Sequence, residues 1–233
     1  MEARTTKIEP SNAPPPFGEL NITLPIVPAS LQARSAKKQA VIANIREVTS
    51  TAEYLLSGDV KVEIEWTVHE QARYESDETP DVDNIIKPIL DALSGPDGIL
   101  INDCQVQAVS CHWVDWTRSE QQVQIRIRFF SDEWCRKAPL MFVHLGRGLC
   151  MPLSEDLPNE ALEIFLDCFE NMLPVREKLL DIGADYYAAQ GVMSVQRVFH
   201  RSRLGGFTVV EVADLRKRLE PPDGPTNHRG ASP

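Results

Sequence analysis

No run of apolar residues in this sequence approaches the roughly 18–20 residues that a membrane-spanning helix requires. The opening residues, MEARTTKIEP, also lack the apolar core of a signal peptide. We therefore expect a cytoplasmic protein with no membrane partner.

Cysteine is sparse, and its five positions are odd in number, widely spaced and free of any CxxC pair: Cys104, Cys111, Cys135, Cys150 and Cys168. No histidines stand nearby at zinc-finger intervals, so we expect reduced, partly buried thiols. The five histidines have no serine or cysteine partner at a known nucleophile spacing. The glycine signatures of a phosphate loop and of a dinucleotide fold are missing as well, so no organic cofactor is expected.

An excess of positive charge is also missing, because 24 Lys and Arg face 34 Asp and Glu, which gives a formal net charge of -10. Non-specific affinity for nucleic acid comes mainly from basic side chains that neutralise phosphates, so this composition argues against a generic nucleic-acid coat. Any contact with DNA has to come from a local basic patch. The content of hydrophobic residues, 42%, is that of an ordinary globular protein.

The first half of the chain alternates between strand and helix patterns. Residues 1–17 are polar and proline-rich, which predicts a disordered arm. Residues 19–27 predict a strand, and residues 30–50 repeat apolar side chains at helical spacing. A strong half-buried strand is predicted at residues 59–68, where polar residues alternate with Val60, Val62, Ile64, Trp66 and Val68.

A polar loop is predicted from residue 69 to residue 79, before a helix in the central stretch. Residues 105–116 and 121–130 then predict two further strands, joined as a hairpin by the turn TRSEQ. The predicted order is strand, helix, strand, helix, strand, strand. We therefore expect a mixed, two-layer α/β fold over residues 18–131.

Composition changes at residues 131–139, which we interpret as a boundary. The run LMFVHL predicts a short strand, and an amphipathic helix pattern follows from Ser154 until Pro174 interrupts it. More helix is predicted after the proline. We expect an appended α/β region at residues 136–219 and a disordered tail at residues 220–233.

That appended region ends in two predicted strands, at residues 192–203 and 206–212, joined as a hairpin. Three arginines lie in the first of them: Arg197, Arg201 and Arg203. We interpret these arginines as a solvated face.

The central stretch, residues 79–106, reads TPDVDNIIKPILDALSGPDGILINDCQV and is unusually rich in carboxylates. Asp81 and Asp83 are two residues apart, so in an extended segment both side chains project to the same side. Two carboxylates that close repel each other when ionised, and a divalent cation is the usual means of keeping both charged. Mg²⁺ suits such oxygen ligands.

A helical stripe follows, formed by Ile85, Ile86, Ile89, Leu90 and Leu93. Asp83, Lys87 and Asp91 are spaced by four residues and form a polar ridge on a different face. Pro88 predicts that the regular helix begins near Pro88 or is kinked there, which leaves residues 81–87 irregular.

Asp103 arrives just before the next strand and could add a third carboxylate. Three aspartates around Mg²⁺ would allow a water to attack a phosphodiester, and Lys87 could offset the charge that grows in the transition state. Structural alternatives stay open: Asp81 as a helix cap, Asp91 as an exposed helix residue, and Asn102 with Asp103 as a turn.

The run PDVDNIIKPILDAL, followed by a glycine-containing turn and ILINDCQV, resembles the RusA family of Holliday-junction resolvases, the crossover junction endodeoxyribonucleases. The family pattern is Asp-x-Asp-Asn-x-x-Lys-x-x-x-Asp-x-Leu before an acidic pair and a valine. The resemblance covers residues 19–131. Asn102 stands where the family commonly has a second acidic residue.

The resemblance implies a RusA-like β-α-β-α-β-β core, a homodimer, and paired nicking of four-way DNA junctions in recombination and repair. It implies Mg²⁺ as the cofactor, with Mn²⁺ as an alternative, and Asp81, Asp83 and Asp103 as catalytic, metal-binding carboxylates. Lys87 corresponds to the essential lysine. Asn84 and Asp91 match the motif, and we assign them supporting roles.

Two basic groups are candidates for contact with DNA phosphates. Arg34, Lys37 and Lys38 share one face of the first predicted helix, and Arg126 and Arg128 share one face of a strand. Residues 1–131 hold 12 Lys and Arg against 19 Asp and Glu, a net charge of -7. We therefore expect DNA binding that is weak and strongly dependent on salt.

Two other functions remain compatible with the sequence. One is a metal-dependent phosphohydrolase that acts on a different phosphate substrate. The other is a catalytically silent DNA-binding or protein-interaction module that keeps the RusA-like fold, with the C-terminal region as its working part.

Overall fold

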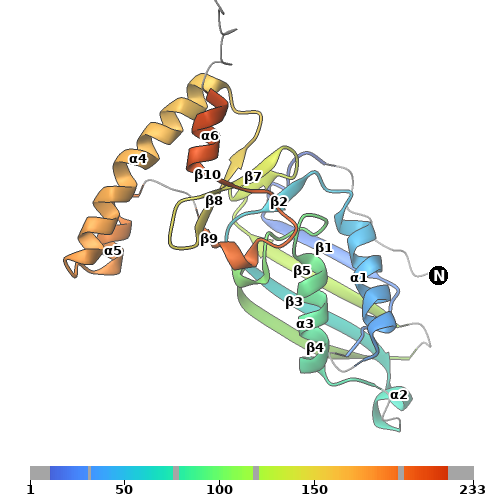
Figure 1. Ribbon diagram of the computed structural model, residues 1–233. Helices are drawn as coiled ribbons and strands as arrows, with labels where there is room; N and C mark the ends of the chain where they lie inside the picture. Colours follow the sequence, from blue (N-terminus) through green and yellow to red (C-terminus); the bar gives the residue numbers. More distant parts are fainter. Residues whose placement is uncertain (1–10, 31–32, 76–78, 118–120, 194–196, 220–233) are drawn as a thin grey trace, which may run out of the picture. The chain divides into compact units, whose positions relative to one another are not determined.

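The computed structural model describes residues 11–30, 33–75, 79–117, 121–193 and 197–219. The chain divides into two compact units (Figure 1). Unit 1 consists of Met1–Leu140 and Ser202–Phe207, and unit 2 of Met141–Arg201 and Thr208–Pro233. The chain therefore leaves unit 1, builds most of unit 2, and returns to unit 1 for one short segment.

A four-stranded sheet forms the centre of unit 1, in the order β1-β5-β3-β4. Its strands are β1 (Glu19–Leu24), β3 (Val60–His69), β4 (Val106–Trp116) and β5 (Gln122–Phe129). β5 pairs antiparallel with both β1 and β3, and β4 pairs parallel with β3. β1, β3 and β4 therefore all run in the same direction.

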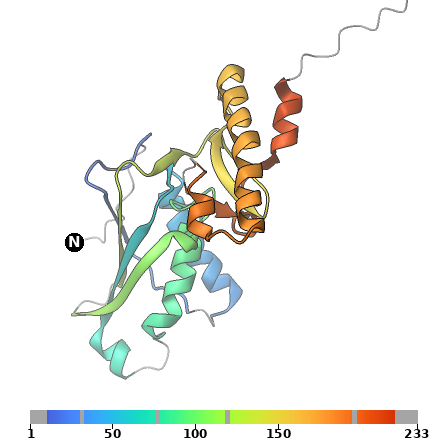
Figure 2. The same cartoon turned by 90° about the vertical axis from the view of Figure 1, so that its left-hand side faces the viewer.

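Two helices cover one face of this sheet, α1 (Ser35–Thr49) and α3 (Val82–Leu93) (Figures 1 and 2). Each helix connects two strands that run in the same direction, so each returns antiparallel to them. The core lies between the layers, because the alternating apolar residues of β3 face Ile45 of α1 and Ile85 and Ile89 of α3, all fully buried. The predicted mixed, two-layer α/β fold is confirmed.

Smaller elements complete unit 1. A two-stranded sheet pairs β2 (Tyr54–Leu56) with β6 (Trp134–Arg136), and the short 3-10 helix η1 (Asp103–Gln105) precedes β4. The predicted polar loop at residues 69–79 is partly wrong, because α2 (Glu70–Tyr74) forms there with His69 accepting a hydrogen bond from the backbone of Gln71.

The predicted hairpin between residues 105–116 and 121–130 is wrong. Both strands exist, but β3 lies between β4 and β5 in the sheet. β3 is buried along its whole apolar face, which favours a central position with partners on both sides. β4 exposes four consecutive residues from Gln107 to Ser110, which fits an edge strand. Residues 118–120 of the predicted turn lie outside the described residues.

The predicted irregularity of residues 81–87 is also wrong. α3 runs without a break from Val82 to Leu93 with Pro88 inside it. Pro88 lacks the N–H that would bond to the fourth residue before it. The buried stripe that includes Ile85, Ile89 and Leu93 offsets this loss by packing against the sheet.

Unit 2 contains a second four-stranded sheet, in the order β10-β7-β8-β9. Its strands are β7 (Leu140–His144), β8 (Leu149–Ser154), β9 (Phe199–His200) and β10 (Val209–Glu211), and its helices are α4 (Asn159–Asp181), α5 (Tyr186–Gln190) and α6 (Val212–Leu219). Its separate core joins Met141 and Val143 of the sheet to Leu166 and Phe169 of α4 and Leu215 of α6.

Two expectations for this region are wrong. α4 continues through Pro174, so the proline does not interrupt it. The last two predicted strands form no hairpin, because β9 pairs with β8, β10 pairs with β7, and the 3-10 helix η2 (Arg201–Arg203) stands between them. Residues 194–196 of that prediction lie outside the described residues.

Residues 1–10 of the predicted arm and all of the predicted tail at 220–233 lie outside the described residues. Residues 11–17 are described: the carbonyl of Ser11 accepts a hydrogen bond of 3.1 Å from the backbone of Glu53, and Pro14 is buried. All five cysteines are free. Four are at least partly buried, as expected, whereas Cys168 is exposed. None of the helices in the described ranges has the length and apolar content needed to cross a membrane.

Candidate functional site

The first two carboxylates of the central stretch lie at the N-terminus of α3. Asp81 is the N-cap residue, in an extended conformation, and Asp83 lies in the first helical turn. Acidic side chains are favoured there because the helix dipole places partial positive charge at this end. Both side chains are exposed, and neither forms an ion pair or side-chain hydrogen bond with any residue that the structure describes.

Lys87 lies one turn further along α3 and connects two carboxylates. Its ammonium group donates a hydrogen bond of 2.8 Å to Oδ2 of Asp103 and another to Asp91. Asp91 is four residues further along the same helix, so the two side chains meet on one face. The hydrogen bonds to Asp103 and then to Asp91 raise the pKa of Lys87. This lysine therefore stays protonated and positive at neutral pH.

Asp103 is held in place by the residues around it in η1. The buried side chain of Gln105 donates hydrogen bonds of 2.8 Å to the carbonyls of Leu56 and Gly58 and accepts one of 3.0 Å from the backbone of Asn102. Asn102 in turn accepts a hydrogen bond of 3.0 Å from the backbone of Cys104. This capping arrangement fixes the short turn that presents Asp103 to Lys87.

The structure joins some of the predicted site residues and leaves others apart. Asp103, Lys87 and Asp91 are in contact, whereas Asp83 lies about 6 Å before Lys87 along the helix axis. Asn84 follows in the same turn, with its backbone donating a 3.1 Å hydrogen bond to the carbonyl of Asp81. The oxygens of Asp81, Asp83 and Asp103 do not form a group within 4.8 Å of one another.

These carboxylates nevertheless suit a hard divalent cation in their chemistry. Asp81 and Asp83 offer exposed oxygens that no described cationic side chain occupies, and Asp103 uses only Oδ2 for Lys87. Mg²⁺ and Mn²⁺ take such oxygen ligands and keep several waters. Asp81, Asp83 and Asp103 are therefore the residues that could hold a metal beside Lys87.

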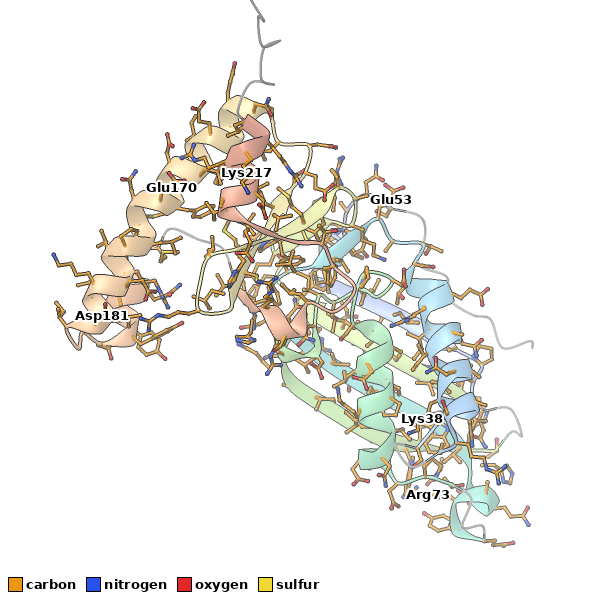
Figure 3. All side chains as sticks on the ribbon, viewed as in Figure 1. Lys38, Glu53, Arg73, Glu170, Asp181 and Lys217 are labelled. Carbon is orange, nitrogen blue, oxygen red and sulfur yellow. The ribbon has the colours of Figure 1, made fainter. Side chains whose placement is uncertain are left out.

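The basic group of α1 lies on the same side of the sheet as α3. Arg34 caps α1, Lys37 and Lys38 are in its first turn, and Figure 3 shows Lys38 on this helix. Both helices run opposite to the strands that they connect, so their N-terminal ends lie at the same end of the sheet. The structure thus places this basic group at the end of the domain where Asp81 and Asp83 stand.

Arg126 and Arg128 lie on the other face of the sheet. Arg126 donates a hydrogen bond of 2.8 Å to Glu63 of β3, and Arg128 one of 3.2 Å to Glu19 of β1. Hydrogen bonds from Asn21 and then Arg128 lower the pKa of Glu19. The two arginines are therefore engaged by carboxylates on a face that α3 does not cover.

A further group on that open face was not anticipated. The ligand atoms of Glu63, Glu65 and His112 lie within 4.8 Å of one another, since the register of β3 and β4 places His112 beside Glu65. The alternation of polar and apolar residues in β3 places Glu63 and Glu65 on one face of the strand. It does not reveal that β4 pairs with β3 and brings His112 beside them. Arg126 already compensates Glu63, so we interpret this group as part of a surface ion-pair network.

Arg203 was also missed. The sequence interpretation placed it on a solvated face, but the segment Ser202–Phe207 belongs to unit 1 and brings Arg203 to the turn that carries Asp103. Its Nη1 donates to Oδ1 of Asn102 at 3.4 Å, and its guanidinium group also contacts Cys104. No local pattern in the sequence reports this return of the chain.

Residues 19–128 match the family model described as Endodeoxyribonuclease RusA. The matched residues form the mixed α/β domain that carries the carboxylates and the lysine of α3. Over these residues the chain is similar to RusA endodeoxyribonucleases. No curated protein sequence matches the chain.

Proposed function

We propose that this protein is a Mg²⁺-dependent, structure-selective endodeoxyribonuclease that resolves four-way (Holliday) junctions by paired nicking during DNA recombination and repair. The observation that carries the proposal is the contact of Lys87 with Asp103 and Asp91 on the helix that begins at Asp81 and Asp83. This arrangement lies wholly inside the segment that matches the RusA family model.

In this proposal Asp81, Asp83 and Asp103 hold the metal. A bound Mg²⁺ or Mn²⁺ supplies Lewis-acid polarisation of a phosphate oxygen and a lowered pKa for a coordinated water. The protein contributes rigid positioning, because α3 carries two of the ligands and the buried amide of Gln105 fixes the turn that carries the third.

Lys87 has a different role. As a phosphodiester is cleaved, negative charge grows on the phosphate and on the leaving oxygen, and a nearby ammonium group stabilises that charge. Its protonated state at neutral pH fits this task. Asp91 orients the lysine by accepting a second hydrogen bond from it, and Asn84 stabilises the first turn of α3 through its backbone hydrogen bond.

Paired nicking requires two active sites, so the proposal includes a homodimer with two-fold symmetry. Arg34, Lys37 and Lys38 provide phosphate contacts at the N-terminal end of α3. Arg126 and Arg128 are weaker candidates, because Glu63 and Glu19 already engage them. The cytoplasmic location stays a prediction.

The test is cleavage of a synthetic four-way junction with labelled strands, with and without Mg²⁺. The wild-type chain should introduce symmetric nicks only with the metal. Asp83→Asn and Asp103→Asn should each lower the cleavage rate by at least about 100-fold, since each removes a charged metal ligand while preserving the shape of the side chain.

The matched control is Asp132→Asn, at an exposed aspartate outside the site. This variant should cut at the wild-type rate, and circular dichroism should show all three variants folded. Metal-dependent binding of the junction without nicking would instead favour the silent module. Faster hydrolysis of small phosphate esters than of any DNA would favour the phosphohydrolase.

A further inference from the structure

The segment Ser202–Phe207 is a fixed part of unit 1, although it lies more than 70 residues after the end of the family match. Leu204 is only 3% exposed, so the segment buries an apolar side chain. Gly206 adopts a φ of +87°, and a Cβ there would lie 3.2 Å from the ring of Pro96. These two residues hold the segment independently of Arg203.

Arg203 itself is exposed, and among the described residues its side chain contacts Asn102 and Cys104. Its guanidinium donates to the amide oxygen of Asn102 at 3.4 Å, a long hydrogen bond. Its guanidinium also contacts the thiol of Cys104. Among the residues that the structure describes, no carboxylate forms an ion pair with Arg203.

This lack of a carboxylate partner sets Arg203 apart from several other arginines of unit 1. Arg73 pairs with Asp115 at 2.7 Å, Arg126 with Glu63 at 2.8 Å, and Arg128 with Glu19 at 3.2 Å. Those guanidinium groups must give up a carboxylate before they bind a phosphate. Arg203 has no such carboxylate among the described residues, and its partner Asn102 is next to Asp103 in the sequence. Its positive charge lies in a domain that is acidic overall.

The position of Arg203 also complements the basic group of α1. Asp103 and Asn102 precede β4 and therefore lie at the end of the sheet where β3 and β4 begin, opposite the N-terminus of α3. Basic side chains thus lie near one end of α3, in Arg34, Lys37 and Lys38, and near the other end, in Arg203. Lys87, between them, is paired with Asp91 and Asp103. The helix between these ends is about 18 Å long.

We propose that Arg203 binds a backbone phosphate of the DNA strand that crosses α3, next to the phosphate at Asp103. The planar guanidinium group suits two oxygens of a phosphate. Since no described carboxylate pairs with Arg203, its side chain can turn toward a phosphate without breaking such an ion pair. The C-terminal part of the chain thereby contributes a DNA contact to a site built by residues 19–128. This inference rests on the function proposed above.

The test measures binding to a fluorescent four-way junction by anisotropy over a salt series, in the full-length chain with Mg²⁺. An Asp83→Asn background prevents cleavage during the measurement. Arg203→Gln should weaken binding about five- to tenfold at low salt and reduce the slope of log K against log salt by about one. Arg203→Lys should restore the salt slope and part of the affinity. Lysine keeps the positive charge but lacks the planar guanidinium group that can donate two hydrogen bonds to one phosphate.

The matched control is Arg136→Gln, which removes the same charge from an exposed position on β6. It should weaken binding less than twofold with an unchanged slope. The melting temperature of Arg203→Gln should stay within about 2 °C of its parent, since one exposed, long hydrogen bond contributes little. A large fall in melting temperature with an unchanged salt slope would assign Arg203 a structural role and overturn the inference.

The remaining outcomes separate the inference from the proposed function. If the wild-type chain nicks the junction but Arg203→Gln and Arg136→Gln bind alike, only the inference fails. If the wild-type chain neither binds nor nicks branched DNA, the proposed function fails and the inference fails with it.

Discussion

At Gln105, a single buried amide holds the turn that carries Asp103. The side chain is fully buried and satisfies three hydrogen-bonding groups: the carbonyls of Leu56 and Gly58 and the backbone N–H of Asn102. Removing one partner from a buried network costs more than the bond itself contributes, because the remaining groups lose water without regaining a partner.

We therefore expect Gln105→Met, which nearly preserves the volume of the side chain, to lower the free energy of unfolding by about 2–4 kcal/mol. The cleavage rate should also fall, since the turn no longer holds Asp103 against Lys87. Urea denaturation and the junction assay measure the two effects. Gln39→Met, at an exposed position of α1, is the control and should change stability by less than about 0.5 kcal/mol. Equal stability of the two variants would contradict the role given to Gln105.

Among the secondary-structure elements, the C-terminus of α1 is tied to the chain after β6 by Lys137. The ammonium group donates a hydrogen bond of 2.9 Å to the carbonyl of Thr49, the last residue of the helix. A cation is favoured at this end because of the helix dipole. Burial nevertheless lowers the pKa of Lys137 to about 8, and Asp97 opposes this shift.

The sign of the resulting pH dependence follows from the two protonation states. Above pH 8 the folded chain loses the proton of Lys137, whereas the unfolded chain keeps it until about pH 10.4. Unfolding then takes up a proton, so raising the pH stabilises the folded state. The cost of burying the charge is fully present below pH 8 and is relieved between pH 8 and about 10.4.

We expect the stability of the wild type relative to Lys137→Met to rise by about 1–2 kcal/mol between pH 8 and pH 10, with solvent screening reducing the full effect. Comparing the two proteins cancels the opposite contributions of Tyr54 and Cys135, whose pKa values burial raises to about 12. Chemical denaturation at several pH values measures the difference. Lys61→Met, at an exposed position, is the control, and its difference in stability from the wild type should not change with pH. If the difference for Lys137→Met also does not change with pH, the role given to Lys137 is wrong.

Most of the elements that carry the site could be predicted from local pattern. The alternation of Val60, Val62 and Ile64 and the helical stripe of α3 depend only on which face each element buries. The order of the strands could not be predicted from local pattern, because the position of β3 between β4 and β5 depends on pairing between residues that are distant in the sequence. Pro88 and Pro174 misled the helix predictions, since tertiary packing offsets one lost hydrogen bond in each helix.

The candidate site divides in the same way. Asp83, Lys87 and Asp91 lie on one helix, so their spacing was enough to predict a polar ridge. The contact of Lys87 with Asp103 joins residues 16 positions apart and was not predicted, since the family resemblance only assigned both residues to the same site. Arg203 comes from a segment about 100 residues further along the chain, where no periodicity indicates a neighbour.

On the scale of the whole molecule, the hydrophobic cluster at the centre of unit 1 consists of residues between Leu20 and Trp134. Unit 2 has a separate core, and Leu204 is the buried apolar residue that the returning segment Ser202–Phe207 adds to unit 1. We therefore expect the chain truncated after Leu140 to fold. Its stability should be lower than that of unit 1 in the full chain by about 2 kcal/mol, the contribution of one buried leucine.

The truncated chain should keep Mg²⁺-dependent nicking, because the carboxylates and Lys87 lie inside it. Loss of Arg203 should reduce the salt slope of junction binding by about one, as in Arg203→Gln. Nicking and anisotropy assays on the truncated chain, the full chain and the full-length Arg203→Gln variant measure both effects. If the truncated chain binds like the full chain, the appended region contributes no phosphate contact. If it is unfolded by circular dichroism, Ser202–Phe207 or unit 2 is required for the fold of unit 1.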